Sequence, residues 1–328
     1  MSNSDNNRVN IIDRRRVDES IGSDIRRGLA SYPKWLPTKY LYDDFGSKLF
    51  NRICELPEYY PTRTEYALLK HVAEEIVSAT KADELVELGS GMAHKTRILI
   101  DAFLGQRKTL HYVPVDISES ALRTSTAALV EEYPMLQIEG IICDYTVDLN
   151  ELNPRNRCLV TFLGSTIGNF TPAETAVLLS DLNSRLSQGD WFLLGVDLVK
   201  PIDVLETAYN DAEGVTAAFN KNILSVTNRE LGANFNLDAF DHFAFFNSES
   251  SRIEMHLIAN QTVDAHLSKL DFEVHFDKDE HVLTEISRKF TRPEVEKMLE
   301  HSGFRLQSWF MSDDEYFALA LSTVGNSR

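Results

Sequence analysis

Two glycines at the end of an apolar run are the first residues whose spacing indicates chemistry. In "VELGSGMAHKT" (residues 86–96), the run leads into Gly89 and Gly91 and then into a helical stretch that contains Lys95. Glycines let the backbone turn sharply and approach a ligand that a side chain would block. The stretch therefore predicts a turn that binds a small molecule at the end of a strand.

The residues around this turn distinguish it from other nucleotide-binding turns. A dinucleotide site has the pattern G-x-G-x-x-G, whose third glycine lets the helix pack closely, and here that position holds His94. The G-x-x-x-x-G-K-[ST] spacing of a phosphate-binding loop is also absent. An acidic residue before the first glycine, Glu87, instead resembles the first motif of class I S-adenosylmethionine-dependent methyltransferases.

Acidic residues also lie at the ends of the next two predicted strands. Asp116 is at the end of the strand 111–117, where a carboxylate can accept hydrogen bonds from both hydroxyls of a ribose. Read alone, Asp116 is equally typical of an acidic residue at a helix N-terminus. Asp144 and Tyr145 end the strand 137–145, where a carboxylate can accept from an adenine amine and an aromatic ring can cover the base. Three such strand ends in succession indicate a methyltransferase cofactor site.

Glu285 and Ser287 indicate a second kind of site. They alternate by two in a predicted strand (281–290), so both side chains face the same side. A carboxylate and a hydroxyl can accept from and donate to the two different nitrogens of an imidazole, and such a site rejects an apolar ring because its own polar groups would go unpaired. The alternative is a salt bridge from Glu285 to Arg288 or Lys289, although the alternation does not obviously place those two on its face.

The elements expected to position these residues alternate between strand and helix. Strands are predicted at 84–89, 111–117, 137–145, 158–165 and 191–199, with helices at 93–104, 118–133 and 172–187. This alternation predicts an α/β fold with a Rossmann-like, doubly wound parallel sheet. A helix in "TRPEVEKMLEHSG" and two closing strands are expected to complete it.

The alternation stops after Lys200, which indicates an insertion. We expect a methyltransferase domain of residues 62–199 plus 290–328, and a substrate-binding lobe of residues 11–61 plus 200–289 whose insertion mixes helical pieces with irregular segments. Residues 1–10 are expected to form a disordered tail, and ligands to bind in a cleft between the lobes. The pattern "TRTE" predicts a capping box with Thr62 at the start of a helix.

Composition limits the classes of function. The 328 residues carry a net charge of -17, which repels phosphate backbones and argues against nucleic acid as a partner. Three scattered cysteines fit a reducing compartment, and no apolar run approaches the ~20 residues needed to span a bilayer. The histidines lack the spacing of a metal site, and "FDKDEH" lacks the glycine of a calcium loop, so it predicts a solvated turn. We expect a cytoplasmic monomer with no metal and no membrane association.

Several long segments resemble one family, the histidine Nα-methyltransferases of ergothioneine biosynthesis. The resemblance extends from about residue 25 to the C-terminus, in the segments "YDDFGSKLFNRICELPEYYPTRTE", "ELVELGSG", "FLGSTIGNFTP", "LLGVDLVK", "AYNDAEGVTAAFNKN" and "LTEISRKF". It implies a Rossmann-like methyltransferase domain with a substrate lobe and S-adenosylmethionine as methyl donor. The implied reaction is three transfers to the α-amino group of L-histidine, which give hercynine.

The resemblance also implies roles for individual residues. Tyr59 matches the residue whose hydroxyl lies at the substrate amine, Asn169 and Tyr209 match the pair that holds the substrate carboxylate, and Glu285 and Ser287 match the imidazole-binding pair. The positions that resemble the pocket wall are Phe50, Gly164, Thr166 and Met255. The positions that match cofactor contacts are Gly89, Lys95, Asp116, Asp144 and Tyr145. The segment Met92 to His94 departs from the smaller or more polar residues expected there.

The chemistry leaves some alternatives open. Methyl transfer is an in-line displacement by a neutral amine, so positioning is the enzyme's main contribution. Tyr59 can orient the amine or act as its base, although an unperturbed tyrosine pKa near ~10 is poorly matched to pH 7. The aromatic faces of Tyr59 and Phe50 can stabilise a methylated ammonium. Other hypotheses are the same chemistry on a tryptophan derivative, a nucleotide-binding oxidoreductase, against which His94 argues, and a binding protein without activity.

Overall fold

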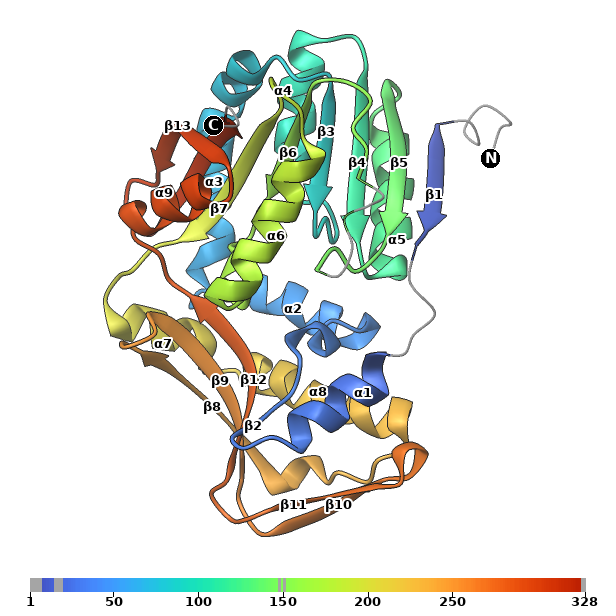
Figure 1. Ribbon diagram of the computed structural model, residues 1–328, viewed down its shortest axis with the longest axis vertical. Coiled ribbons are helices and arrows are strands. Elements are labelled where there is room, and N and C mark those ends of the chain that lie inside the picture. The colour runs from blue at the N-terminus through green and yellow to red at the C-terminus, as the bar shows by residue number, and fades with distance from the viewer. Residues whose placement is uncertain (1–7, 15–19, 147–148, 150–151, 326–328) are drawn as a thin grey trace. The chain divides into compact units, whose positions relative to one another are not determined.

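The computed structural model describes residues 8–14, 20–146, 149 and 152–325 (Figure 1). The chain forms two compact units. The first consists of Met1–Arg16, Pro61–Val199 and Phe290–Arg328, and the second consists of Val17–Tyr60 and Lys200–Lys289. Among the described residues, no helix has the length and apolar character needed to cross a membrane.

The first unit is built on an eight-stranded sheet with the order β1-β5-β4-β3-β6-β7-β14-β13 (Figure 1). The six strands from β1 to β7 in this order are parallel, while β14 and β13 are antiparallel to their neighbours. The strands are β1 (Val9–Asp13), β3 (Glu84–Leu88), β4 (Leu110–Asp116), β5 (Leu136–Ile142), β6 (Cys158–Phe162), β7 (Trp191–Asp197), β13 (Phe304–Met311) and β14 (Phe317–Val324).

Helices cover both faces of this sheet. One apolar cluster packs α6 and α9 against one face, and a second packs α3, α4 and α5 against the other. The helices are α3 (Tyr60–Thr80), α4 (Thr96–Gln106), α5 (Glu119–Glu132), α6 (Pro172–Arg185) and α9 (Arg292–His301). Because both faces are covered, β3 and β6 are buried along their whole length, which explains why most of their residues are apolar. The observed sheet confirms the predicted α/β, doubly wound class.

The carboxyl edge of this sheet has a topological switch point. β3 lies between β4 and β6, so the chain leaves β3 in one direction and returns on its other side. Ligands of doubly wound sheets bind at such a point, outside the carboxyl ends of the strands. The predicted cofactor positions lie at this edge: Gly89 and Lys95 between β3 and α4, Asp116 at the end of β4, and Asp144 and Tyr145 after β5.

The second unit combines helices with a four-stranded sheet of order β2-β12-β9-β8 and a separate β10-β11 hairpin. Its strands are β2 (Lys34–Trp35), β8 (Phe240–Asn247), β9 (Arg252–Ala259), β10 (Val263–Leu267), β11 (Phe272–Phe276) and β12 (His281–Arg288). Its helices are α1 (Ser20–Leu29), α2 (Asp44–Glu55), α7 (Ile202–Tyr209) and α8 (Val215–Leu231), with short 3-10 helices at Thr38–Leu41, Leu237–Ala239 and Ser268–Leu270.

The sequence analysis missed the strands β8 to β11 in this unit. Its irregular reading of the insertion was wrong, because β8, "FDHFAFFN", carries aromatic residues toward both faces of the sheet. A strand with apolar residues on both faces lacks the polar alternation by which a half-exposed strand is recognised. β10, "VDAHL", does alternate between buried and exposed residues, but it is only five residues long.

Two other local predictions need correction. Within the predicted tail of residues 1–10, the first seven lie outside the described residues, but Val9 and Asn10 belong to β1, which pairs with β5. Residues 11–14 therefore group with the first unit and not with the predicted substrate lobe. The capping box is also wrong, because α3 begins at Tyr60 and Thr62 lies inside it. The Glu65 carboxylate instead accepts the backbone N–H of Gly164, elsewhere in the first unit.

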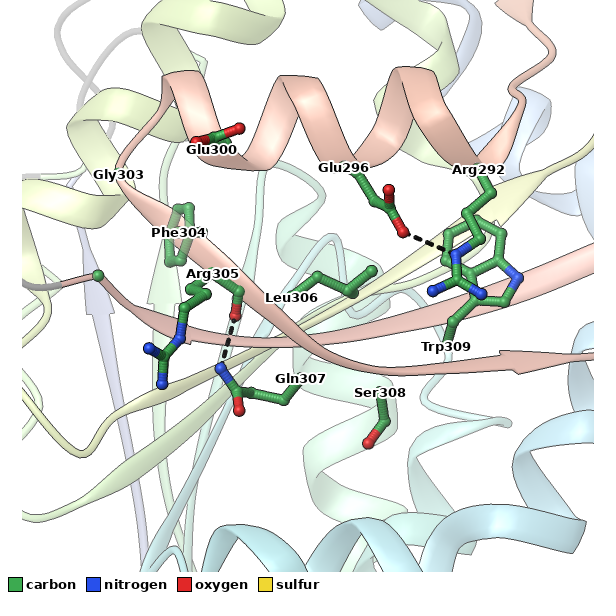
Figure 2. Close-up of a pocket in the computed structure, with 11 residues that line it drawn as sticks. Arg292, Glu296, Glu300, Gly303, Phe304, Arg305, Leu306, Gln307, Ser308 and Trp309 are labelled. Carbon is green, nitrogen blue, oxygen red and sulfur yellow. Dashed lines mark hydrogen bonds and ion pairs between the residues drawn. The ribbon is translucent and has the colours of Figure 1, made fainter.

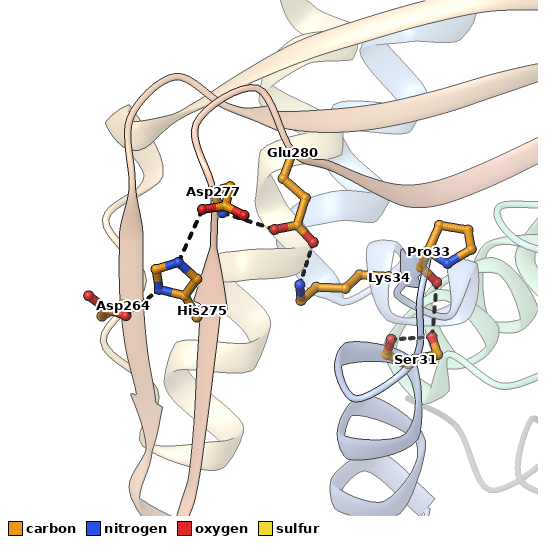
Figure 3. Close-up of polar contacts among 8 residues, drawn as sticks. Ser31, Pro33, Lys34, Asp264, His275, Asp277 and Glu280 are labelled. Carbon is orange, nitrogen blue, oxygen red and sulfur yellow. Dashed lines mark hydrogen bonds and ion pairs between the residues drawn. The ribbon is translucent and has the colours of Figure 1, made fainter.

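The turn "FDKDEH" and the hairpin beside it carry a network of charged side chains (Figure 3). Glu280 forms an ion pair with Lys34 and accepts a hydrogen bond from the backbone N–H of Asp277 at 2.9 Å. His275 lies between Asp264 and Asp277, with ring nitrogens 2.7 and 3.4 Å from their carboxylates. Hydrogen bonding to Asp264 and Asp277 raises the pKa of His275. The network links the β10-β11 hairpin and β2 to the start of β12.

Candidate active site

The glycine turn after β3 has the geometry that the sequence predicted. Gly89 and Gly91 both have left-handed backbone angles, with φ of +69° and +50°. A Cβ atom at Gly91 would meet no atom within 4 Å, whereas one at Gly89 would lie 3.4 Å from the Tyr145 hydroxyl. The turn therefore presents bare backbone to open space, where a ligand can approach it closely.

Asp116 connects the turns that follow β3 and β4. Its Oδ2 accepts the backbone N–H of Gly91 at 2.7 Å, and its Oδ1 accepts that of Ser118 at 2.8 Å. Burial raises the pKa of Asp116, and the hydrogen bonds from Ser118 and Gly91 oppose that shift. Each carboxylate oxygen has two lone pairs, so both oxygens can also accept from a ligand hydroxyl. The residues here fit the ribose of S-adenosylmethionine.

Asp144 and Tyr145 lie in the loop after β5. The Asp144 carboxylate accepts the backbone N–H of Thr146 at 3.0 Å, which fixes its orientation. The Tyr145 ring packs edge-on against Phe162 of β6 with centroids 5.6 Å apart. Burial raises the pKa of Tyr145, so its hydroxyl stays protonated. The role of this carboxylate and this ring at an adenine stays a prediction.

Glu87 lies beneath the glycine turn and does not line it. The Thr96 hydroxyl donates to its carboxylate at 2.6 Å, and the Tyr112 hydroxyl donates to the same oxygen at 2.5 Å. Burial raises the pKa of Glu87 to about 7, while the hydrogen bonds from Thr96 and Tyr112 lower it. The acidic residue of the motif thus ties β3 to α4 and β4, and holds the turn in place.

Glu65 is a functional residue that the sequence analysis missed. Its carboxylate is fully buried; both oxygens accept the backbone N–H of Gly164, at 2.8 and 2.9 Å, and one forms an ion pair with Lys95. Gly195 of β7 makes room for it, because a Cβ there would lie 2.3 Å from Glu65 Oε1. The unexplained glycine in the apolar run "LLGVDLV" was the signal that could have revealed this buried carboxylate.

The predicted wall residues Gly164 and Thr166 lie in the loop after β6, together with Asn169. Gly164 has φ of +76°, and Thr166 donates to the carbonyl of Leu163 at 2.9 Å. Asn169 ends a short 3-10 helix, Thr166–Asn169, and is half-buried. The structure places these three in the first unit, at the same sheet edge as the glycine turn.

The other predicted substrate residues lie in the second unit, and three of them share an aromatic cluster. The Tyr59 ring lies 6.1 Å from that of Phe50 and 6.0 Å from that of Tyr209. Tyr42 and Phe219, which the sequence analysis missed, extend the cluster, with centroids 5.4 and 5.9 Å from Phe50. A cluster of several aromatic rings is the kind of surface that binds a methylated ammonium.

Tyr59 is almost completely buried, and this changes its acidity. Burial raises the pKa of Tyr59 well above its ordinary value, and the negative forms of Tyr209 and Cys54 would raise it further. The hydroxyl therefore stays protonated at neutral pH. It can donate or accept a hydrogen bond, but its anion is strongly disfavoured, which favours the orienting role over the role of a base.

Glu285 and Ser287 face the same side of β12, as predicted. Met255 of β9 is directly opposite Glu285, so these two side chains are also neighbours. Burial raises the pKa of Glu285 to about 7, and the positive charge of Lys289 opposes that shift. Within the described part of the chain, no donor lies within hydrogen-bonding distance of Glu285 Oε2.

Lys289 shares this face of the strand, which corrects the sequence analysis. Its ammonium donates to Ser287 Oγ at 2.8 Å and to the Tyr209 hydroxyl at 3.1 Å. The alternation from Glu285 through Ser287 to Lys289 was the available signal. The structure differs from the alternative of a salt bridge between Glu285 and Lys289, because the Lys289 ammonium donates to the hydroxyls of Ser287 and Tyr209.

A surface groove in the first unit is separate from these residues (Figure 2). It has a volume of about 750 Å³ and lies along α9 and β13. Its lining includes Arg292, which forms an ion pair with Glu296 at 2.7 Å and lies over the ring of Trp309. None of the predicted cofactor or substrate residues lines this groove.

Comparison with known proteins identifies the family. A family model described as a histidine-specific, SAM-dependent methyltransferase matches residues 21–324. The chain belongs to this family. The match confirms the predicted family and the class of enzyme, and S-adenosylmethionine is the methyl donor of this class.

Relatives of this histidine-specific methyltransferase include proteins with different named substrates. The chain is 46% identical to a histidine N-alpha-methyltransferase from Mycolicibacterium smegmatis, over 93% of this chain and 95% of that protein. It is 28% identical to ergothioneine biosynthesis protein 1 from Schizosaccharomyces pombe, over 84% of this chain and 37% of that protein. It is also 28% identical to an L-tryptophan methyltransferase from Psilocybe serbica, over 96% of this chain and 98% of that protein.

Proposed function

We propose that this protein transfers three methyl groups from S-adenosylmethionine to the α-amino group of L-histidine, giving hercynine for ergothioneine biosynthesis. The observation that carries the proposal is Glu285. A buried carboxylate oxygen without a hydrogen-bond partner among the described residues costs free energy, and native proteins retain few such groups. A ligand N–H would satisfy it.

An imidazole fits the polar groups at this position. Its N–H can donate to Glu285, and its second ring nitrogen can accept from Ser287, two residues along the same strand face. An indole has one N–H and no ring acceptor, so it would leave Ser287 unpaired. This difference favours histidine over the tryptophan derivatives on which a more distant relative acts.

The aromatic cluster contains the groups that would bind the reacting amine. The oxygen of the Tyr59 hydroxyl can accept a hydrogen bond from the amine N–H, which orients the nitrogen lone pair toward the methyl group. Solvent takes the proton that the amine loses. Bound S-adenosylmethionine supplies a methyl group on a positively charged sulfur, and residues at Gly89, Asp116, Asp144 and Tyr145 would hold its nucleoside part. As methyl groups accumulate, the faces of Phe50 and Tyr59 can stabilise the growing cation, worth about 0.5–2 kcal/mol per favourable contact.

Other predicted contacts belong to the same proposal. Tyr209, together with Asn169, is proposed to hold the substrate carboxylate, with Gly164, Thr166 and Met255 as further substrate contacts and Lys95 as a further cofactor contact. In the structure the Tyr209 hydroxyl donates to Ser287 at 2.9 Å, and we propose that it keeps this hydrogen bond and contacts the bound carboxylate through a bridging water.

We also propose that the protein acts as a cytoplasmic monomer without a metal ion. Its three cysteines, Cys54, Cys143 and Cys158, form no disulfide in the described part of the chain, which fits a reducing compartment. Light scattering during gel filtration would measure the mass of the assembly, and a mass near twice 37.2 kDa would contradict the monomer.

The test of the reaction is mass spectrometry on a panel of amino acids. The purified protein is incubated with S-adenosylmethionine and with histidine, tryptophan or phenylalanine in separate reactions. We expect additions of one, two and three methyl groups to histidine alone. A gain on tryptophan without a gain on histidine would transfer the assignment to the other amino acid. Chelator in a parallel reaction should leave the yield unchanged.

A further inference from the structure

Lys289 is a buried cation in the second unit to which the proposed reaction gives no role. Its side chain is only 2% exposed. A charge taken out of water must find partners, and here the ammonium donates to Ser287 Oγ and to the Tyr209 hydroxyl. Lys289 also lies over the Tyr209 ring, 4.9 Å from its centroid. The two hydroxyls it contacts are both predicted to bind the substrate.

The hydrogen bonds at Ser287 can be counted. A serine hydroxyl has one hydrogen to donate and two lone pairs to accept with. An ammonium can only donate, so Lys289 occupies one lone pair, at 2.8 Å. The Tyr209 hydroxyl donates to the second at 2.9 Å. Both lone pairs are therefore in use, and the remaining capacity of Ser287 is its single hydrogen.

Ser287 Oγ is the acceptor in both of these hydrogen bonds, and no side chain or carbonyl among the described residues accepts the Ser287 hydrogen. Two residues earlier on the same face, Glu285 Oε2 is an acceptor without a donor among the residues that the structure describes. The strand thus presents one unused donor and one unused acceptor side by side. The acceptor is the carboxylate of Glu285. The donor is the hydroxyl of Ser287, because Lys289 and Tyr209 occupy its lone pairs.

We propose that Lys289 is a positioning residue that makes Ser287 a hydrogen-bond donor, so that the site selects a neutral five-membered ring carrying one N–H and one bare nitrogen. The inference rests on the proposed function, because it assigns a specificity mechanism to the same site. An imidazolium carries an N–H at both nitrogens, and one of them would face a hydroxyl with no lone pair left. An apolar ring would leave both Glu285 and Ser287 unpaired.

The consequence is a specific defect when the lysine charge is removed. In Lys289→Met, Ser287 regains a lone pair and its hydrogen can turn toward the Tyr209 oxygen. Ser287 is then satisfied without a ligand acceptor, so the variant should discriminate less against a ring that cannot accept. The lost discrimination corresponds to one hydrogen bond, about a tenfold change in relative affinity.

The experiment compares L-histidine with 2-thienylalanine, whose five-membered ring has a similar size but no nitrogen. Calorimetry at pH 8.5 gives both dissociation constants for the wild type and for Lys289→Met, because Glu285, with a pKa of about 7, is ionised in the wild type there. We expect the ratio of the two constants to fall about tenfold in the variant. In a Ser287→Ala background, Lys289→Met should leave the ratio unchanged.

The matched control is Lys200→Met. Lys200 is also a buried lysine of the second unit, but its ammonium donates to the Tyr60 hydroxyl at 2.8 Å and lies over the Tyr60 ring. This variant should keep the wild-type ratio. Binding of S-adenosylhomocysteine reports folding in every variant. If Lys289→Met does not bind it, Lys289→Leu replaces it, since leucine cannot donate to Ser287 either, with the same expected fall.

Two failures can be told apart. If the wild type does not bind histidine more tightly than 2-thienylalanine, the proposed function itself is wrong. If the wild type discriminates and Lys289→Met keeps the full ratio, with both ligands weakened equally or not at all, Lys289 has only a structural role and the inference is overturned.

Discussion

The buried carboxylates of the two units differ in how completely they are paired. In the first unit, Glu65, Glu87 and Asp116 each accept two or more hydrogen bonds from groups of the same unit. In the second unit, Glu285 has an oxygen without a partner among the described residues, and its pKa is raised to about 7. The carboxylates of the first unit are satisfied before any ligand binds, whereas Glu285 stays incomplete without one.

This difference indicates two kinds of buried carboxylate: those that hold their own loops, whether or not they also bind a ligand, and one that only a ligand can complete. A paired buried carboxylate stabilises the loops that it holds, as Glu65 does for Gly164. An unpaired oxygen such as Glu285 Oε2 costs about 1–3 kcal/mol or more, and a ligand N–H at that position would remove this cost. Changes in the first unit should therefore affect stability and cofactor binding, and changes in the second should affect substrate binding.

Glu285→Ala tests this distinction with the largest expected effect. Removing the carboxylate deletes a charged hydrogen bond to the imidazole, worth about 1.5–3 kcal/mol, so histidine affinity should fall about 10- to 100-fold. Calorimetry with S-adenosylhomocysteine should give the wild-type constant. Unchanged histidine affinity would show that the imidazole does not bind at Glu285.

Glu285→Gln should stabilise the protein while weakening its substrate. The folded pKa of about 7 exceeds the ordinary value of 4.5, so the folded protein loses stability as pH rises from 4.5 to 7, by up to about 3 kcal/mol for this group. The variant removes that cost. We expect a higher midpoint of urea unfolding than wild type at pH 8, and a difference that shrinks toward pH 5. Equal midpoints at pH 8 would contradict the burial argument.

Gly195→Ala tests the first unit through stability. The new Cβ would lie 2.3 Å from Glu65 Oε1, and such overpacking typically costs about 1–3 kcal/mol. Thermal unfolding should show the loss, and S-adenosylhomocysteine should bind more weakly because Glu65 holds Gly164 and Lys95. Gly105→Ala is the matched control: its Cβ would meet no atom within 4 Å, and alanine is the better helix former. A stable Gly195→Ala protein would mean that Glu65 is free to move.

Tyr59→Phe has the smallest expected effect and tests the orienting role. Loss of one hydrogen bond to the amine should lower kcat about tenfold. Because the raised pKa of Tyr59 keeps its hydroxyl protonated, the shape of the pH–rate profile below pH 9 should be the same in both proteins. An ionisation present in the wild type and absent from the variant would instead identify Tyr59 as the base.

Whether a strand could be predicted from the sequence depended on which of its faces are covered. The strands of the large sheet could be predicted because both of its faces are covered, which favours long apolar runs such as "WFLLGV" of β7. β8 could not, since its aromatic residues face both sides of the sheet. β1 was missed because its short segment "VNIID" is only partly buried and is recognisable as a strand only beside β5.

The candidate site divides in the same way. The predicted cofactor residues, such as Gly89 and Asp116, lie at the ends of strands whose order along the chain is regular, so local motifs were enough to predict them. Glu65 matched a local pattern, the capping box, but its partners are 30 and 99 residues away. A local pattern does not reveal a distant partner, and this is why the cap prediction was wrong.

The sequence by itself determined the family and the doubly wound sheet, and it predicted the types of residue proposed to bind each part of the two ligands, because these depend on periodicity and on motifs short enough to read along the chain. Only the tertiary structure decided which hydroxyl donates and which accepts. Ser287 is a donor because Lys289 and Tyr209, two and 78 residues away, occupy its lone pairs. Hydrogen-bond direction depends on all the groups around an atom, and folding brings those groups together from distant parts of the chain.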